Sequence, residues 1–405
     1  MKKKVVAAGL WIPTSGLTRV IDNVLKKVAE EFDVTLLGIG YTGAKKKHGQ
    51  INLLPCNVNG GDMYGVRQLE SIFQEVQPAV FFLCTDLALL PFYDSLIALH
   101  QHKLKSILYL PIDGAVINPF VKGFMPPFDC VVAYNQFGID VLNTAFEQMN
   151  EVTQTQHPTL RLLPHGIDNT SFYPLPAEQK QTICQRITGI PYENDNMPFI
   201  VLNANRPHFR KRIDTTIEGF SIFSKNKPKN VLLYLHHSRT RKEERAEVLH
   251  LIDKYQLNDR VLLNTILPID DYWGDKELNE LYNICSVGIN TSMGEGWGLV
   301  SFEHAATGMA QIVPDHSACG ELWKDCGLVI PATNPYEFML CNSRMREVKP
   351  EDVALALEKL YVDKPFREHI ATKGKEMVHH PDFQWDTIQN KWLALFNEVL
   401  LSTNY

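Results

Sequence analysis

Short apolar strands alternate with amphipathic helices along this chain, and the alternation runs through twice. Such a pattern predicts parallel sheets with helices on both faces, so we expect an α/β protein with two doubly wound, Rossmann-like domains. The first pass predicts strands at 4–9, 34–39, 79–84, 106–110 and 129–134, with helices at 18–31 and 136–149. The second pass predicts strands at 199–203, 231–235, 260–264, 286–290, 311–313 and 328–330, with helices at 212–225, 241–256, 276–284, 299–307 and 317–323.

The length of 405 residues suits two domains. The segment "LPHGIDNTSFYPLP" is rich in turn formers and proline, which predicts a boundary near 166–175. We therefore expect an N-terminal domain over 1–170 and a C-terminal domain over 171–380. The remaining 381–405 contains an amphipathic helix that is expected to pack back on the N-terminal domain. Two such domains would face each other across a cleft, where ligands bind in doubly wound folds.

Composition excludes several classes of protein. Hydrophobic residues make up 45% and charged residues 21%, which is typical of a soluble globular chain. The opening "MKKKVVAAGLW" favours a first strand over a signal peptide, because its apolar part is short. The eight cysteines lack paired metal spacing, so we expect reduced core residues of a cytoplasmic protein. No feature indicates an oligomeric state.

The charge balance points away from nucleic acid, since the net charge is −6. One basic run stands out, Lys45-Lys46-Lys47-His48. We interpret it as a solvated loop. The alternative is a peripheral contact with a membrane surface or with an acidic acceptor.

The stretch Ser292–Glu303 carries the strongest chemical signal. It follows a predicted buried strand, and its Gly-x-Gly turn leads into a predicted helix. This arrangement aims backbone N–H groups and a helix N-terminus at an anion such as a phosphate. Glu295 and Glu303 would be repelled by that anion, so we expect them to bind neutral parts of the same ligand, such as the hydroxyls of a sugar and of a ribose.

A cationic cluster, "NANRPHFRKRID" (203–214), follows another predicted strand. Arg206 and Lys211 would converge at the ligand edge of the sheet and neutralise a diphosphate. Arg210 and Arg212 add positive charge, so which of the four cations touches the ligand stays open. The alternative is a basic loop that is salt-bridged to acidic helices. The Glu295–Glu303 turn, predicted at the same edge, favours the diphosphate.

This ordered set resembles a known family. Arg206-x4-Lys211 followed by Glu295-x7-Glu303 is similar to the retaining glycosyltransferases of the GT-B fold, in particular the family 4 group (glycosyl transferases group 1). "PHGIDNTSFYP" (164–174) resembles the interdomain element of that family, and "GEGWGLVSFEHAATG" (294–308) resembles its "EGFGL..LEAMA.G" signature. The terminal "FQWDTIQNKW" resembles its closing helix. The likeness is strong in the second domain and weaker in the first.

The resemblance implies transfer of a sugar from a nucleoside diphosphate sugar to an acceptor hydroxyl, with retention of configuration. Arg206 and Lys211 would hold the diphosphate of the donor, Glu303 the ribose, and Glu295 the transferred sugar. Backbone N–H groups would also contact the donor, from Trp297, Gly298, Leu299 and Val300. The donor would be a UDP- or GDP-sugar as co-substrate, and the acceptor a glycan, a lipid or a small molecule. No metal is expected, because the two cations can neutralise the departing diphosphate.

Other residues have weaker assignments. Trp297 stands where the family has Phe, so it narrows the sugar pocket or fills the core. Gly16, at a helix start in the first domain, would let backbone approach the ligand. Asp113 occupies about the position at which many relatives have a His that contacts the sugar. It would accept a hydrogen bond from a sugar or acceptor hydroxyl, or form an Asx turn. His165 is expected to bond the linker backbone.

Four further expectations concern a strand end and several loops. His236 and His237 are adjacent on a strand, so they make a poor metal pair. Asp270 and Asp271 are expected in a solvated loop. We expect 264–273 to help recognise the base, and 41–65 and 115–127 to form acceptor pockets.

Rival functions keep the fold but change the reaction, since fold does not fix function. A nucleotide-sugar epimerase would convert the donor without an acceptor, and a sugar phosphorylase is a related alternative. A non-catalytic nucleotide-sugar-binding protein would bind the donor without turnover. A nucleic-acid acceptor would show salt-dependent binding.

Overall fold

The computed structural model describes residues 2–13, 15–152, 157–190, 197–237, 242–263 and 273–402. The chain divides into two compact units. The first comprises Met1–Gly166, Glu337–Arg344 and Pro381–Tyr405, and the second comprises Ile167–Tyr336 and Met345–His380. The segment 264–273, which we expect to help recognise the base and which includes Asp270 and Asp271, lies outside the described residues except for Trp273.

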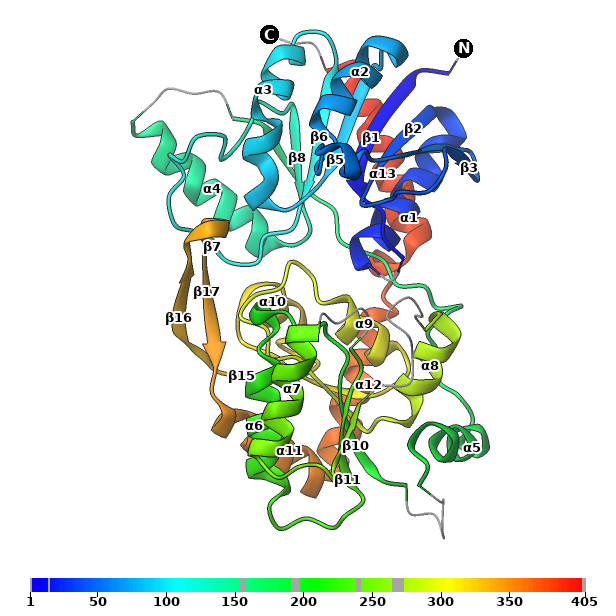
Figure 1. Ribbon diagram of the computed structural model, residues 1–405, viewed down its shortest axis with the longest axis vertical. Coiled ribbons are helices and arrows are strands. Elements are labelled where there is room, and N and C mark those ends of the chain that lie inside the picture. Colours follow the sequence, from blue (N-terminus) through cyan, green and yellow to red (C-terminus); the bar gives the residue numbers. More distant parts are fainter. Residues whose placement is uncertain are drawn as a thin grey trace. The chain divides into compact units, whose positions relative to one another are not determined.

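The first unit is built on an eight-stranded sheet with the order β3-β4-β2-β1-β5-β6-β8-β9 (Figure 1). Its strand pairs are parallel except for β3 with β4. The strands are β1 Lys4–Leu10, β2 Asp33–Ile39, β3 Lys46–His48, β4 Ile51–Pro55, β5 Val80–Cys84, β6 Lys105–Leu110, β8 Cys130–Ala133 and β9 Thr159–Leu162. The helices are α1 Gly16–Glu31, α2 Val66–Val76, α3 Leu90–His100, α4 Gln136–Asn150 and α13 Trp385–Leu401.

Continuous apolar runs explain the centre of this sheet. Every residue of β5, "VFFLC", is buried, as expected for a parallel strand that is covered on both faces. The amphipathic α1 buries one face of valine, isoleucine, leucine and alanine side chains. The basic run 45–48 contributes a short edge strand, β3, so the expectation of a plain loop is wrong; His48 there binds Asp22 at 2.8 Å.

The C-terminal helix α13 belongs to the first unit and packs beside α1 (Figure 1). The ring of Trp392 lies 4.6 Å from Tyr109 and 5.4 Å from Phe82, centroid to centroid. Gly166 lies against Trp385, where an added Cβ would come within 2.6 Å of the indole ring. Aromatic packing of this kind fixes the helix on the unit.

The second unit has a six-stranded parallel sheet with the order β12-β11-β10-β13-β14-β15. The strands are β10 Phe199–Asn203, β11 Val231–Leu235, β12 Val261–Leu263, β13 Val287–Ile289, β14 Ala310–Pro314 and β15 Leu328–Ile330. The helices are α5 Ala177–Thr188, α6 Ile213–Ser224, α7 Lys242–Lys254, α8 Asp275–Ile284, α9 Leu299–Ala306, α10 Ser317–Trp323, α11 Pro350–Val362 and α12 Lys364–Val378. The strand order reverses between β10 and β13, and such a switch point is where doubly wound sheets bind ligands.

A third, small sheet was not expected from the sequence. It consists of β16 Ala332–Phe338, β17 Ser343–Val348 and β7 Ala115–Val116, in the order β16-β17-β7. β17 pairs antiparallel with β7, and the turn residue Asn342 exchanges hydrogen bonds with Asn118 at 2.7 and 2.9 Å. Gly114 permits this pairing, because a Cβ there would lie 2.3 Å from the carbonyl oxygen of Arg344.

Candidate active site

The loop that follows β10 is held in place by a buried chain of polar side chains. Asn203 donates to the Thr216 hydroxyl at 2.8 Å, and Thr216 lies 2.8 Å from the Thr291 hydroxyl. Thr291 Oγ1 in turn donates toward the carbonyl oxygens of Lys211 and Arg212, at 3.0 and 2.8 Å. This chain fixes the backbone at the end of the cationic loop and connects it to the strand end of β13.

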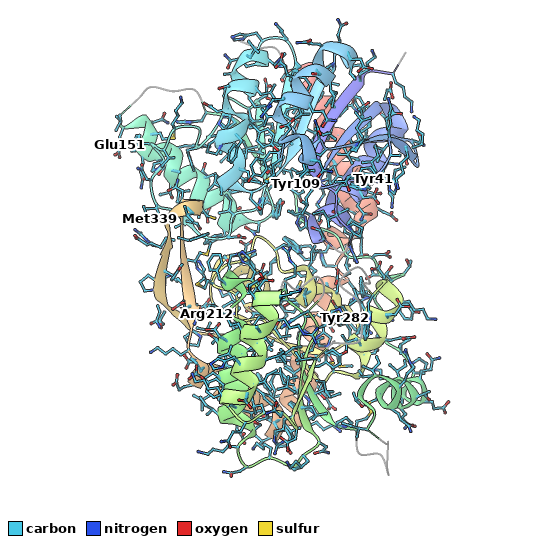
Figure 2. All side chains as sticks on the ribbon, in the orientation of Figure 1. Tyr41, Tyr109, Glu151, Arg212, Tyr282 and Met339 are labelled. Carbon is cyan, nitrogen blue, oxygen red and sulfur yellow. The ribbon has the colours of Figure 1, made fainter. Side chains whose placement is uncertain are left out.

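Arg212 takes a left-handed conformation at the start of α6, with φ 47°. Arg212 is labelled in Figure 2. Its guanidinium is bound by Asp214 at 2.8 Å and by Glu347. The side chain is therefore committed to a structural ion pair. That removes Arg212 from the four cations that the sequence offered as ligand contacts.

The ammonium of Lys211 forms an ion pair with Glu295, which is only 7% exposed. Arg210 joins the same carboxylate at 3.5 Å and donates to the carbonyl oxygen of Gly294. The loops that follow β10 and β13 therefore meet at the switch point of the sheet. A backbone bond from Met293 N–H to the carbonyl oxygen of Arg210, 2.9 Å long, ties them further.

Glu295 is the most densely bonded carboxylate of this site. Its Oε1 accepts from Asn290 at 3.1 Å and from Ser292 at 2.8 Å, in addition to Lys211. Burial by itself would raise the pKa of Glu295. The charges of Lys211 and Arg210, with the hydrogen bonds, outweigh burial and lower that pKa from 4.5 to about 2. Glu295 is thus ionised at neutral pH and acts as a hydrogen-bond acceptor.

The backbone beyond Glu295 turns at Gly298 and enters α9. Gly298 has φ 90°, a conformation that L side chains rarely adopt, so the turn depends on glycine. The first-turn N–H groups of α9, at Leu299 and Val300, have no acceptors within the helix. The N-terminus of α9 therefore offers hydrogen-bond donors and the positive end of the helix dipole. It begins four positions after Glu295, the partner of Lys211.

Glu303 and Trp297 lie on and before the same helix. Glu303 is 7% exposed and accepts a hydrogen bond from the Tyr282 hydroxyl at 3.1 Å. Trp297 is 3% exposed and packs against Phe302, with ring centroids 5.0 Å apart. Of the two roles expected for Trp297, this contact supports filling of the core.

Arg206 has an exposed side chain and no ion pair within the described ranges. Its charge is nevertheless felt locally. Burial, together with the charges of Arg210, Arg206 and Lys211, lowers the pKa of His208 to about 4. The cationic loop thus has a positive potential, and Arg206 differs from Lys211 because no carboxylate of the described residues pairs with it.

Two predicted residues belong to the first unit. Gly16 begins α1, with Ser15 in an extended conformation before it. Asp113 lies three residues past the end of β6 and is half-buried. Both loops leave the sheet at its carboxyl edge, because β1 and β6 run in the same direction through β5.

Of the predicted histidines, His165 and His236 are buried and His237 is half-buried, and all three are held neutral. His165 lies 2.8 Å from the hydroxyl of Tyr109, and that hydroxyl also donates to the carbonyl oxygen of Leu163 at 3.1 Å. Tyr109 thus connects His165 to the backbone of this segment, and a direct bond from His165 to the linker backbone stays a prediction. Burial lowers the pKa of His165 to about 3, that of His236 to about 4 and that of His237 to about 3. His236 packs on Trp273 with the ring centroids 5.0 Å apart.

Sequence reasoning missed the residues that shape this site. Asn203, Thr216, Thr291 and Asn290 are all buried, although the sequence around them contains other polar residues. Asn and Thr at the carboxyl ends of predicted strands are a usable signal, since such positions face the ligand edge of a parallel sheet. Ser317 adds an acceptor for the Glu295 N–H at 2.9 Å and adopts φ 53°, which its sequence context does not indicate.

Other features bear on the classes of site. No cluster of three or more His, Cys, Asp or Glu side chains in the described residues has the arrangement of a metal site. All eight cysteines are free and seven are buried. Within the described ranges, every helix is too short or too polar to traverse a bilayer.

Comparison with known proteins agrees with this geometry. Residues 190–340 match the family described as Glycosyl transferases group 1. Comparison with curated protein sequences gave no significant match.

Solved structures resemble the chain over nearly its whole length. Sucrose-phosphate synthase from Thermosynechococcus elongatus has a TM-score of 0.73 at 14% identity, covering 99% of this chain and 100% of that one. HepE from Anabaena, in complex with UDP and glucose, has a TM-score of 0.70 at 12% identity, and the match covers 98% of this chain and 100% of that one. A glycosyltransferase from Rickettsia africae has a TM-score of 0.71 at 15% identity, and the match covers 99% of this chain and 100% of that one. At such identities the likeness establishes the fold. The chain therefore has the GT-B fold with two Rossmann-like domains, and its residues 190–340 match the Glycosyl transferases group 1 family.

Proposed function

We propose that this protein is a retaining glycosyltransferase, which moves a sugar from a nucleoside diphosphate sugar to an acceptor hydroxyl. The observation that carries the proposal is the meeting of Lys211, Arg210 and Glu295 at the switch point of the second sheet, where α9 begins. Cations and a helix N-terminus suit a diphosphate, and buried ionised carboxylates suit hydroxyls. The match of residues 190–340 supports the same activity.

The donor would contact both the cations and the carboxylates of this cluster. Arg206 and Lys211 hold the diphosphate, and the N–H groups of residues 297–300 complete its contacts. Glu303 binds the ribose hydroxyls. Glu295 binds the transferred sugar as an acceptor of hydrogen bonds, because a pKa of about 2 leaves it no proton to donate. The phosphate and Glu295 share the Lys211 ammonium, which would place the reacting carbon between them.

The reaction breaks the bond between the anomeric carbon and the β-phosphate oxygen, and forms a bond to the acceptor oxygen on the same face. Positive charge develops on the sugar while negative charge grows on the departing phosphate. Lys211, Arg206 and the N-terminus of α9 stabilise that negative charge. The departing phosphate takes the proton of the acceptor hydroxyl, so the products are the glycoside and the nucleoside diphosphate.

The first unit would supply the acceptor side. Gly16 allows close approach of backbone to the donor, and Asp113 accepts a hydrogen bond from a sugar or acceptor hydroxyl. Exclusion of water on closure would limit hydrolysis of the donor. The structure of HepE with UDP and glucose supports a UDP-sugar as the first donor to test, with GDP-sugars next.

The experiment begins with a thermal-shift screen of UDP-, GDP-, ADP- and dTDP-sugars on the full chain, because a ligand stabilises the state that it binds. The donor that raises the melting temperature is then incubated with and without acceptors. We expect a glycoside with the anomeric configuration of the donor, determined by NMR. Conversion of the donor alone into another nucleotide sugar would establish an epimerase, and binding without turnover for any acceptor would establish a sensor.

Arg206→Ala tests the diphosphate contact, with Arg245→Ala as a matched control. Both arginines are exposed and lack ion pairs among the described residues. We expect Arg206→Ala to weaken the thermal shift that the nucleotide sugar causes, and Arg245→Ala to preserve it. Equal shifts in both variants would contradict the assignment of Arg206.

A further inference from the structure

The first unit contains an open cavity of about 660 Å³ that the proposed donor site does not use. It lies where β4 ends and α2 begins, and Thr42 and Gly43 from the loop after β2 form one wall. Because β1, β2 and β4 are parallel, this cavity lies at the sheet edge from which the Gly16 loop also departs. Its volume is in the usual range of small-molecule sites.

A rigid frame shapes the cavity. Asp62 is 8% exposed and its carboxylate accepts the Gln68 N–H at 2.9 Å, which caps the first turn of α2. Gln68 in turn bonds the backbone N–H of Asn57 and the carbonyl oxygen of Pro55, at 3.0 and 2.8 Å. These bonds tie the loop to the helix, so the cavity is formed before any ligand enters.

Arg67 lines this frame with an exposed guanidinium. No hydrogen bond or ion pair engages that guanidinium in the part of the chain that the structure describes. Arg67 also stands in the first turn of α2, where the positive end of the helix dipole disfavours a cation. A bound anion would relieve this repulsion and would provide the partner that the guanidinium lacks.

Two further cations stand close to the cavity lining in the sequence. Lys45 and Lys46 follow the wall residues Thr42 and Gly43 in the chain, and neither has a carboxylate partner among the described residues. The Lys46 ammonium instead lies 5.4 Å from the ring centroid of Tyr41. The lining carboxylate, Asp62, is already bonded to α2. Among the lining residues, Arg67 is thus a cation without a carboxylate partner in the described chain, and Lys45 and Lys46 add positive charge to the segment that follows Thr42 and Gly43.

We propose that this cavity binds the acceptor through an anionic group, a phosphate ester or a carboxylate, that pairs with Arg67. The inference rests on the proposed function, since it assigns the acceptor of that reaction to the class of small anionic polyols. Asn57, Asn59 and Ser71 line the same space and provide amides and a hydroxyl for the neutral hydroxyl groups. Arg67 would favour ligands that carry a negative charge, and these neutral groups would bind the hydroxyl groups of the same ligand.

The test uses calorimetry on the full chain with saturating UDP, which blocks the donor diphosphate site. Glucose 6-phosphate, glucuronate and glucose are the three probes, so the two anion sources are distinguished from each other and from the neutral sugar. We expect at least one anion to bind and glucose not to bind. Arg67→Gln should raise the dissociation constant of that anion about 10- to 100-fold, as for loss of a charged hydrogen bond. Arg245→Gln, at an exposed arginine of α7 that has no ion pair among the described residues, should leave that dissociation constant unchanged.

Two results would overturn the proposal: no binding of either anion, or equal binding in the wild type and Arg67→Gln. Neither result touches the donor site. UDP binding is measured first in each variant, and failure of the wild type to bind any nucleotide would count against the proposed function alone. Binding of glucose as tightly as the anions would also overturn the role of Arg67.

Discussion

The two cationic regions of this molecule differ in what balances their charge. In the second unit, Lys211 and Arg210 meet the buried carboxylate of Glu295, and Arg212 meets Asp214 and Glu347. In the first unit, Arg67, Lys45 and Lys46 have no carboxylate partner within the described residues. A paired cluster contributes to stability and holds its ligand groups in place, whereas unpaired exposed cations contribute little to folding and remain available for a ligand. Mutations in the two regions should therefore separate stability from binding.

The largest effect is expected for Lys211→Ala. This change removes a charge that we assign to the departing phosphate, so turnover should fall about 10²- to 10³-fold. Steady-state kinetics with a matched donor and acceptor measure the loss, and circular dichroism checks folding. Lys225→Ala, an exposed lysine after α6, serves as the control. A folded Lys211→Ala protein with near-normal turnover would refute the diphosphate assignment.

Glu295→Gln should reveal a pH-dependent stability. The folded-state pKa of about 2 lies below the ordinary 4.5, so the carboxylate stabilises the fold fully above about pH 4.5 and loses that effect as the pH falls toward 2. The shift corresponds to about 3 kcal/mol at pH 7. Urea denaturation of both proteins at several pH values should show the stability gap closing below pH 4.5.

Glu337→Gln is the control for that experiment. Glu337 pairs with Arg344, but both side chains are about half exposed, at 48% and 52%. Exposed ion pairs contribute about 0–1 kcal/mol, so this variant should change little at any pH. A difference in unfolding free energy between the wild type and Glu295→Gln that stayed constant from pH 7 to pH 2 would show that the carboxylate is not held ionised by its cations.

Sequence patterns predicted the strands of the second unit well because they are largely continuous apolar runs. β10 "FIVLN" and β11 "VLLYL" are wholly buried, and the expected ranges match them. The turn at Gly298 was readable for a similar reason, since glycine marks a conformation that other residues avoid. Local composition specified both features.

Pairing between distant segments was not readable. β7 is only two residues long, and its partner β17 begins 227 positions after Val116, where Ser343 pairs with it. Neither segment shows an alternating apolar pattern that would predict a strand. The roles of Lys211 and Arg210 as partners of Glu295 were hidden as well, because they depend on two loops that only the sheet order brings together.

Thr291→Val tests whether the buried polar chain holds the cationic loop. The change preserves the shape of the side chain but removes the hydroxyl that bonds Thr216 and the carbonyl oxygens of Lys211 and Arg212. Buried groups left without partners cost about 1–3 kcal/mol, and urea denaturation should show a loss of that size. Thr144→Val, at an exposed position of α4, should change stability by less than about 0.5 kcal/mol. Equal effects in the two variants would mean that the loop does not depend on Thr291.

The smallest effect is expected for the stability of Arg67→Gln, and it completes the contrast between the two regions. Because the guanidinium is exposed and makes no ion pair in the described chain, its loss should change the free energy of unfolding by less than about 0.5 kcal/mol. Removal of a cation from the first turn of α2 should even be slightly favourable. Thermal melting of ligand-free protein measures this difference. A destabilisation as large as that of Thr291→Val would show that Arg67 has a structural partner, and the division between a paired donor site and an unpaired acceptor cavity would then be lost.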